Sequence, residues 1–208
     1  MLKQKSCKQC KTKFTPDRPL QMVCSFMCSV EYTKANQAKK AKKDWVKEKA
    51  ERKEKIMTKS DWEKLFQILI NHIARLIDHN QPCIATNTMN GKRNGGHRYS
   101  VASNPSIRFN LHNVHIQSEH SNVWKGGDND RYDEGLERVY GLDYKDYVRS
   151  LNQTKPLHLT IEPIKEKILI AKLIKKELIE LGNTYTSAER IQLRHDLNQR
   201  IGLYLDCF

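Results

Sequence analysis

Residues 95–122 decide the fold of this chain and read GGHRYSVASNPSIRFNLHNVHIQSEHSN. Glycine, asparagine and proline punctuate the stretch, with short apolar segments at 99–101 and 107–109. This pattern is typical of a hairpin of short strands. Residues 113–124 could then resume a helix. We therefore expect two short strands and a helix around clustered histidines and asparagines.

These residue types suit the cleavage of a phosphodiester. Cleavage needs a base to activate water, a divalent ion at the scissile phosphate and groups that orient the base. His97, at the end of a glycine-marked turn, is the natural base. Asn113 would orient that imidazole or pin the loop. His115 and Asn122, about two helical turns apart, could face a divalent ion.

The same residues have plainer explanations. His97 could be a turn histidine that bonds to the backbone, and Asn113 could serve as a helix N-cap. His112, His115 and His120 could be solvated polar residues, and this explanation is preferred for His112 and His120. The nuclease hypothesis therefore depends on the rest of the chain.

Four of the six cysteines fall within 22 consecutive positions, as Cys7-x-x-Cys10 and Cys24-x-x-x-Cys28. In a reducing compartment such crowding points to metal rather than to disulfides. Two close pairs of thiolates form the two knuckles of a tetrahedral zinc site, and a segment this small can hardly fold without the metal. The sequence predicts structural Zn²⁺; unpaired thiols in a floppy tail are the alternative.

Positive charge is concentrated at the N-terminus. The formal net charge is +13, and residues 1–59 contain 17 Lys or Arg against 6 Asp or Glu. Residues 29–59 lack Pro and Gly and predict an exposed basic helix. A cationic arm beside a near-neutral body suits the binding of nucleic acid, although a solvated charged face is the alternative. The cations expected to contact DNA are Lys39, Lys40, Lys42 and Lys43 on this helix and Lys92, Arg93, Arg98, Arg108 and Lys125 around the hairpin.

Helical periodicity marks the region between the arm and the hairpin, and it returns after the hairpin. Ser60 with Glu63 predicts a capping box, followed by apolar residues at helical spacing to about residue 77. Residues 132–151 are also predicted to be helical. No apolar run approaches the roughly 20 residues that span a bilayer, and the N-terminus lacks a secretory signal. We therefore expect a cytoplasmic protein with no membrane partner.

Two further helices are predicted at the C-terminus. Pro163 opens an amphipathic helix that Gly182 ends, and Thr186 with Glu189 caps a last helix that runs to about Leu205. The apolar faces of these helices could pair with a second copy in a homodimer, or they could complete the core of this chain.

The expected fold class is α+β and mostly helical. A small ββα-metal (HNH-like) core would be joined by an N-terminal four-cysteine zinc knuckle, a basic helix and C-terminal helices. We expect four regions: a zinc-binding module at 1–28, a basic helical arm at 29–59, a nuclease core with its leading helix at 60–151, and a C-terminal helical region at 152–208.

The ordered set of motifs resembles the lambdoid phage NinG (Rap) recombination endonucleases of the HNH or His-Me finger superfamily. The motifs are the array Cys7 to Cys28 with Phe14 and Pro16, the basic helix, Pro82-Cys83-Ile84, Gly96-His97, Arg108-Phe109, Asn113-Val114-His115, and residues 132–141 with Gly135-Leu136 and Arg138. The resemblance implies a phage or prophage protein in a bacterial host. It also implies structure-specific cleavage of branched recombination intermediates such as D-loops and Holliday junctions. Similarity to His-Me nucleases such as phage endonuclease VII implies that Asn122 is a ligand of the catalytic ion.

The chain departs from that family in two places. The resemblance implies a second set of four zinc-binding cysteines, but here Cys83 is joined by Thr86, Ser118 and Ser121. Hydroxyls are poor substitutes for thiolates, so either packing has replaced the metal or this copy is degenerate. Gly96 stands where many HNH enzymes place an acidic ion ligand.

Two functions follow as expectations. The first is an HNH-type endonuclease that acts on branched or single-stranded DNA with His97 as general base and Mg²⁺ or Mn²⁺ as the catalytic ion. The alternative is a non-catalytic DNA-binding recombination accessory protein with a degenerate core.

Overall fold

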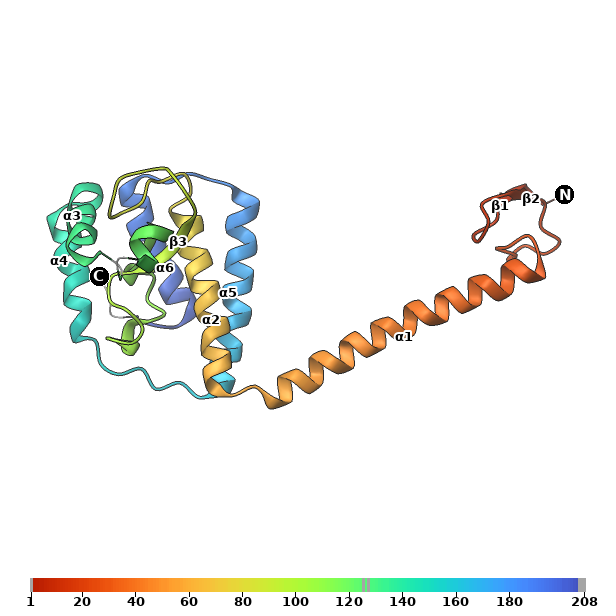
Figure 1. Ribbon diagram of the computed structural model, residues 1–208, viewed down its shortest axis with the longest axis horizontal. Coiled ribbons are helices and arrows are strands. Elements are labelled where there is room, and N and C mark those ends of the chain that lie inside the picture. Colours follow the sequence, from red (N-terminus) through yellow and green to blue (C-terminus); the bar gives the residue numbers. More distant parts are fainter. Residues whose placement is uncertain (1, 125, 127, 206–208) are drawn as a thin grey trace. The chain divides into compact units, whose positions relative to one another are not determined.

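The computed structural model describes residues 2–124, 126 and 128–205, with backbone only at residue 124. The chain divides into two compact units, 1–57 and 58–208, whose elements are labelled in Figure 1. Within the described residues, no helix is long and apolar enough to cross a membrane.

The first unit joins a small hairpin to a long helix. Strands β1 (Lys5–Ser6) and β2 (Lys13–Phe14) pair antiparallel. Helix α1 (Phe26–Ile56) begins at Ser25, whose side chain accepts a hydrogen bond from the Cys28 amide. The helix has no buried residue, so its stability rests on local helix propensity and on exposed side-chain pairs. The prediction of an exposed basic helix is confirmed.

Helix α2 (Lys59–Ile77) opens the second unit with a capping box. Thr58 accepts a hydrogen bond from the Asp61 amide, and the Asp61 carboxylate accepts one from the Thr58 amide. The predicted box of Ser60 and Glu63 is therefore wrong by two residues. Thr58 caps better because its extended backbone directs its hydroxyl toward the free amides of the first turn.

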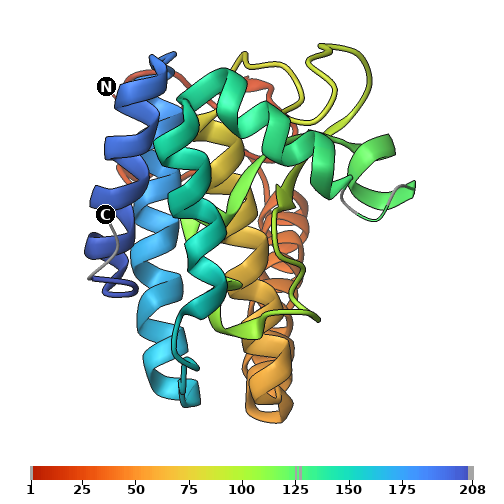
Figure 2. The same ribbon diagram turned by 90° about the vertical axis from the view of Figure 1, so that its left-hand side faces the viewer.

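The main core lies between α2, α5 (Ile161–Leu181) and α6 (Ser187–Ile201), which run side by side in Figure 2. Pro163 lies in the first turn of α5, and Gly182 ends it with a left-handed φ of 57°. The predicted capping box of Thr186 and Glu189 is confirmed. The C-terminal helices thus complete the core of this chain, and residues 152–208 do not form a separate region. The α5 residues in this core are Ile164, Ile168, Ala171, Ile174 and Leu178.

The central hairpin consists of β3 (Arg93–His97) and β4 (Val114–Ser118), paired antiparallel with His97 opposite Val114. The predicted strands at 99–101 and 107–109 and the predicted helix at 113–124 are wrong. Residues 98–113 form the connecting loop, and β4 is followed by a π-helical turn (His120–Trp124).

Glycine misled the prediction because here it lies inside a strand. A Cβ at Gly95 would come within 2.8 Å of the Asn71 backbone oxygen, and one at Gly96 within 2.0 Å of the Gln117 side chain. Gly95 lets β3 lie directly against α2, and Gly96 makes room for the Gln117 side chain of β4, so this sequence marks two close approaches and not a turn.

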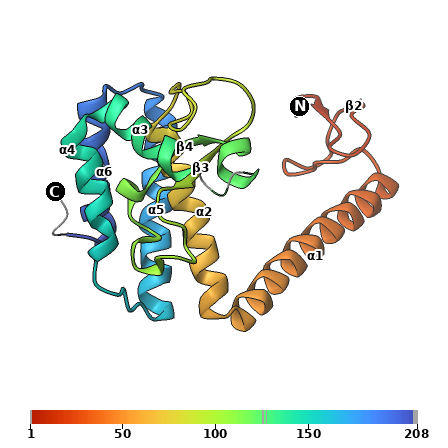
Figure 3. The same cartoon turned by 60° about the vertical axis from the view of Figure 1, so that its left-hand side comes forward.

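Helices α3 (Asn129–Tyr140) and α4 (Leu142–Ser150) form a second, smaller core. Gly141, with a φ of 91°, separates them where one helix was predicted. In Figure 3 the hairpin lies between these helices and α2. The fold is therefore mostly helical, with two small two-stranded sheets.

A buried ion pair lies where the main core and the smaller core meet. Asp78, 1% exposed, accepts two hydrogen bonds of 2.8 Å from Arg194, which is wholly buried. The same carboxylate accepts from the Ile116 amide of β4 (2.9 Å) and from the Tyr140 hydroxyl of α3 (3.2 Å). Burial by itself would lower the pKa of Arg194, but the charge of Asp78 outweighs it and keeps the pKa above its ordinary value. Arg194 is therefore charged at any pH at which the protein folds.

We predict that Asp78→Ala lowers the free energy of unfolding by about 3–5 kcal/mol, because it leaves a buried guanidinium without its counter-charge. Chemical denaturation followed by circular dichroism measures the change. Glu180→Ala is the matched control: its side chain is 64% exposed, so the expected change is within about 0.5 kcal/mol. Equal stability of the two variants would contradict the role of the ion pair.

Candidate functional site

The four N-terminal cysteines form one cluster. The sulfur atoms of Cys7, Cys10, Cys24 and Cys28 lie within 4.8 Å of one another and could hold a metal ion. Cys24 Sγ lies 3.6 Å from both Cys10 Sγ and Cys28 Sγ. A tetrahedral zinc with Zn–S bonds of about 2.3 Å would space its sulfurs about 3.8 Å apart. The predicted ligand set is therefore brought together at a spacing suited to zinc.

The thiols of this cluster have unequal proton affinities. Burial acts to raise the pKa of Cys7, but hydrogen bonds from the backbone amides of Cys10, Cys24 and Gln9 outweigh it and bring the pKa to about 6. Side-chain hydrogen bonds with Cys10 and Cys28 raise the pKa of Cys24 to about 12. Because zinc takes thiolates as ligands, loading the site must release protons.

Residues 83–88 repeat the backbone turn of residues 7–12. In each turn the amide of the leading cysteine donates to the carbonyl five residues on, at 2.8 Å for Cys7 and 2.9 Å for Cys83. The amide four residues on donates back to the cysteine carbonyl, at 3.0 Å and 2.8 Å. Those fourth residues, Lys11 and Asn87, have φ of 65° and 54°. The second turn is therefore a knuckle in its backbone, although it has one cysteine.

Hydrogen bonds join the side chains at this second knuckle. Cys83 Sγ accepts from the Ser118 amide at 3.1 Å, and Ser118 Oγ donates to Ser121 Oγ at 3.2 Å. Burial acts to raise the pKa of Cys83, but hydrogen bonds with Thr86 and Ser118 outweigh it and lower the pKa. Gly135 of α3 packs against this turn so closely that a Cβ would come within 1.8 Å of the Ile84 carbonyl oxygen. Packing and hydrogen bonds therefore hold this turn, and whether the copy is degenerate stays a separate question for the nuclease core.

His97, the last residue of β3, is half-buried between the hairpin loop and α2. Its Nε2 lies 3.2 Å from the Arg108 carbonyl oxygen and 3.0 Å from the Gln67 amide nitrogen. A carbonyl only accepts and an NH₂ group only donates, so the two contacts need different tautomers. Desolvation lowers the pKa of His97, and the Arg108 carbonyl works in the opposite direction. The ring is therefore neutral at pH 7, as a general base must be.

Asn113 pins the loop that connects the strands. Its Oδ1 accepts from the Tyr99 amide (2.9 Å), and its Nδ2 donates to the Tyr99 carbonyl (3.0 Å) and the Ile107 carbonyl (3.4 Å). The Arg98 amide donates to the Asn113 carbonyl at 2.9 Å. Asn113 ends a 3-10 turn, so it is not a helix N-cap. Asn113 was predicted either to orient the His97 ring or to pin the loop, and these hydrogen bonds match the second role.

Helix α2 contributes side chains that the sequence analysis missed. Gln67 Nε2, which contacts His97, also donates to Asn71 Oδ1 at 2.8 Å. Arg108 bonds to Glu63 at 2.9 Å and to Gln67 at 3.4 Å. The available signal was the polar stripe of Glu63, Gln67 and Asn71 at every fourth position of this amphipathic helix.

His115 is not brought to the His97 side of the hairpin. It pairs with Gly96, one residue before His97, and successive residues of a strand point to opposite faces. Its ring is wholly buried, with Nδ1 3.0 Å from the Tyr132 hydroxyl and Nε2 3.2 Å from the Tyr144 hydroxyl. Burial holds its pKa well below the ordinary value. These contacts give His115 a place in the core and not at an ion on the His97 face.

The two remaining histidines of this segment, His112 and His120, lie in different environments. His112 is wholly buried, with Nδ1 3.1 Å from the Tyr144 hydroxyl, so the expectation of a solvated residue is wrong for it; the small turn at 111–113 points it inward. His120 is exposed as expected. Asn122 is half-buried in the π-helical turn. Apart from the cysteine cluster, the described residues contain no group of three His, Cys, Asp or Glu side chains placed to hold a metal.

The cations predicted to bind DNA fall into two sets. Around the hairpin, every predicted cation that the structure describes has a partner inside the chain, and these contacts close the loops there. Lys125 lies outside the described residues. Asp133 pairs with Arg98, Glu63 with Arg108 and Glu119 with Lys92, and Arg93 donates to the carbonyls of Gln81 and Met89. On α1, Lys39, Lys40, Lys42 and Lys43 are exposed, and no ion pair to another described residue is seen for them.

Comparison with protein families matches residues 1–183 to the family described as Bacteriophage Lambda NinG protein. The chain belongs to the NinG family. A search of curated proteins and of solved structures returned no match. NinG is a family of phage proteins related to recombination, so this part of the resemblance is confirmed. The assignment to the HNH nucleases stays a prediction. The family match covers both knuckles and the hairpin and ends before α6.

We predict that this NinG protein binds one equivalent of zinc, at the N-terminal cysteine cluster. Cys24→Ser should lose the metal, because one hydroxyl cannot replace a thiolate in the tetrahedral set. Cys83→Ser is the matched control and should keep one equivalent, since the second knuckle is closed by hydrogen bonds. Elemental analysis of the purified full chain measures both. Two equivalents in the wild type, or metal loss in the Cys83 variant, would refute this assignment.

Proposed function

We propose that this NinG protein is a structure-specific DNA endonuclease that cuts branched recombination intermediates such as D-loops and Holliday junctions. The observation that carries the proposal is the placement of His97: a neutral imidazole at the end of a strand, beside a loop pinned by Asn113. Phage recombination, to which the family is related, supplies branched DNA as a substrate.

His97 would act as the general base. In the tautomer that bonds to Arg108, Nε2 donates its proton to the carbonyl at 3.2 Å. Nδ1 then has its lone pair free to accept a proton from the attacking water. Asn113 fixes the loop that carries this carbonyl, because it bonds to Ile107, the neighbour of Arg108, as well as to Tyr99. The orientation of the ring is thus set before DNA binds, which is what efficient proton transfer requires.

The protein offers few ligands for a catalytic Mg²⁺ or Mn²⁺ ion. We assign Asn122 as a ligand on the family resemblance alone. A hard cation that keeps several waters and binds substrate phosphates needs only one or two ligands from the protein. When bound, such an ion would neutralise charge on the phosphate and the departing oxygen. Arg108 lies close to His97, but its ion pair with Glu63 would have to break before it could contact a phosphate.

The basic helix would supply most of the affinity for DNA. Its lysines are exposed, whereas the described hairpin cations are engaged within the chain. Lysines along an exposed helix contact phosphates without reading sequence. The protein would therefore hold DNA with the first unit and cut it with the second.

A non-catalytic DNA-binding accessory protein is the second candidate. Two observations favour it: the hairpin lacks a cluster of charged ion ligands in the described residues, and Gly96 leaves no room for a side chain. Incubation with forked or four-way DNA in Mg²⁺ or in EDTA separates the candidates. Metal-dependent products support the endonuclease, and retarded but uncut DNA supports the accessory protein.

We predict that His97→Ala lowers the cleavage rate at least 100-fold and leaves the dissociation constant for forked DNA within about 3-fold, because a general base acts mainly in the transition state. The exposed His120→Ala is the matched control and should cut at the wild-type rate. Single-turnover cleavage and gel retardation measure the two quantities. Wild-type cleavage by the His97 variant would remove this residue from the mechanism.

The pKa of His97 lies below its ordinary value, so the ring stays deprotonated at pH 7 and above. We therefore predict that titration of His97 does not change the cleavage rate in this pH range. The rate should fall only as the pH drops through a value below about 6.5, where the ring gains a proton. Single-turnover rates measured from pH 5 to pH 9 test this. A rate that still rises tenfold per pH unit above pH 7 would point to a different base.

We predict that the double variant Lys39→Gln/Lys43→Gln weakens binding to every DNA. The logarithm of the binding constant falls linearly with the logarithm of the salt concentration, and the magnitude of this slope should decrease by about one to two. Each phosphate that is no longer neutralised removes about one unit. Lys172→Gln/Lys176→Gln on α5 is the matched control, because it removes the same charge at the same spacing from another exposed helix face. Its slope should stay unchanged. The same small effect in both pairs would show that the arm does not bind DNA.

A further inference from the structure

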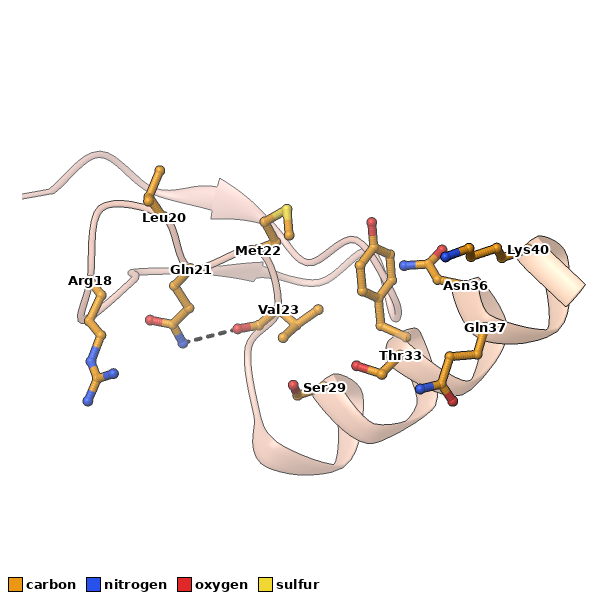
Figure 4. Close-up of a pocket in the computed structure, with 11 residues that line it drawn as sticks. Arg18, Leu20, Gln21, Met22, Val23, Ser29, Thr33, Asn36, Gln37 and Lys40 are labelled. Carbon is orange, nitrogen blue, oxygen red and sulfur yellow. Dashed lines mark hydrogen bonds between the residues drawn. The ribbon is translucent and has the colours of Figure 1, made fainter.

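A groove in the first unit lies between the loop 18–23 and the start of α1. Its volume is about 650 Å³, within the range of sites that hold small ligands. Figure 4 shows Met22 and Val23 on the loop and Asn36 and Gln37 on the helix around this space. The aromatic ring of Tyr32 also lines it.

The loop wall of the groove is tied in place. Gln21 accepts a hydrogen bond from the Asp17 amide (2.7 Å) and donates to the Val23 carbonyl (3.0 Å). The Lys8 amide donates to the Met22 carbonyl (2.9 Å). The next residue, Cys24, belongs to the metal-binding cluster, as does Cys28 in the first turn of α1. The cluster therefore brings together the end of the loop wall and the start of the helix wall.

The lining combines three kinds of chemistry. Leu20, which is 90% exposed, and Met22 offer apolar surface to solvent. The side-chain amides of Asn36 and Gln37 make no hydrogen bond to other described residues. Arg18 and Lys40 bring positive charge, and no carboxylate lines the groove. This lining suits a ligand that is partly apolar, carries hydrogen-bonding edges and is attached to negative charge.

We propose that this groove takes an unpaired nucleotide of DNA, with the base against Tyr32 and the apolar wall, and with the phosphates of the strand continuing toward Arg18 at one end of the groove and Lys40 at the other, where Figure 4 shows them. This deepens the proposed function, on whose DNA substrate it rests. Every base has a π-face, so aromatic stacking beside cations binds single strands without sequence preference. The amides of Asn36 and Gln37 would meet the edge of the base, which is exposed only when the nucleotide is unpaired. The groove would thus let the protein prefer branched DNA to duplex.

The test compares two DNA duplexes with single-stranded tails of equal length, one of thymidines and one of abasic sites, and a blunt duplex. The tails carry the same phosphates and differ only in bases. For the full-length wild type we expect roughly 5- to 100-fold tighter binding of the thymidine tail than of the abasic tail. Equal affinity for the two tails would overturn the proposal, while cleavage of forked DNA in Mg²⁺ would still report separately on the endonuclease.

Three variants then locate the effect. Tyr32→Ala should lose most of the preference for the thymidine tail, Tyr32→Phe should keep it because the ring remains, and neither should change binding to blunt duplex by more than about 2-fold. Trp45→Ala, an exposed aromatic of the same helix outside the groove, should behave as wild type. One equivalent of bound zinc in each variant shows that the module is folded. An unchanged preference in Tyr32→Ala, or an equal loss on blunt duplex, would overturn the proposal.

Discussion

The second unit is organised around one buried carboxylate. Asp78 lies just after the end of α2 and accepts hydrogen bonds from a strand amide, a tyrosine and an arginine on three other elements. A buried charge is tolerated only when it is paired and fully bonded, so these partners can take only a narrow range of positions. The bond to the Ile116 amide fixes β4, and the pairing of β4 with β3 then fixes the end of the strand that carries His97. The candidate site thus depends for its position on a buried charge bonded to the backbone of β4, the strand that pairs with β3.

The helices of this chain could be predicted from sequence because helical burial leaves a periodic pattern. The apolar repeats of α2 and α5 and the capping box of α6 are local signals, and they place the core correctly. The hairpin could not be predicted as well. Its glycines serve contacts with Asn71 and Gln117 that lie far away in sequence or across the strand pair. A local interpretation assigns such glycines to turns. The two strands were therefore predicted at 99–101 and 107–109, which belong to the loop that connects the real strands.

Part of the candidate site was also within reach of sequence. The cysteine spacing identified the four side chains that could hold a metal ion, and His97 and Asn113 lie at one end of the hairpin with a shared loop. His115 shows the limit: the residues around it were expected to be helical, and only the strand alternation reveals that it faces the tyrosines of α3 and α4. The partners of the hairpin cations come from acidic residues up to 45 positions away, which composition cannot show.

The two knuckles share a backbone turn but differ in what closes it. Four cysteines that could hold a metal ion form the first, and hydrogen bonds among Cys83, Ser118 and Ser121 close the second. Scarcity of zinc would affect only a site that holds it. Zinc starvation would therefore act on the first knuckle when it carries metal, while hydrogen bonds at Cys83 and Ser118 hold the second knuckle beside the hairpin that carries His97. The shape of the second unit would not depend on the supply of the metal.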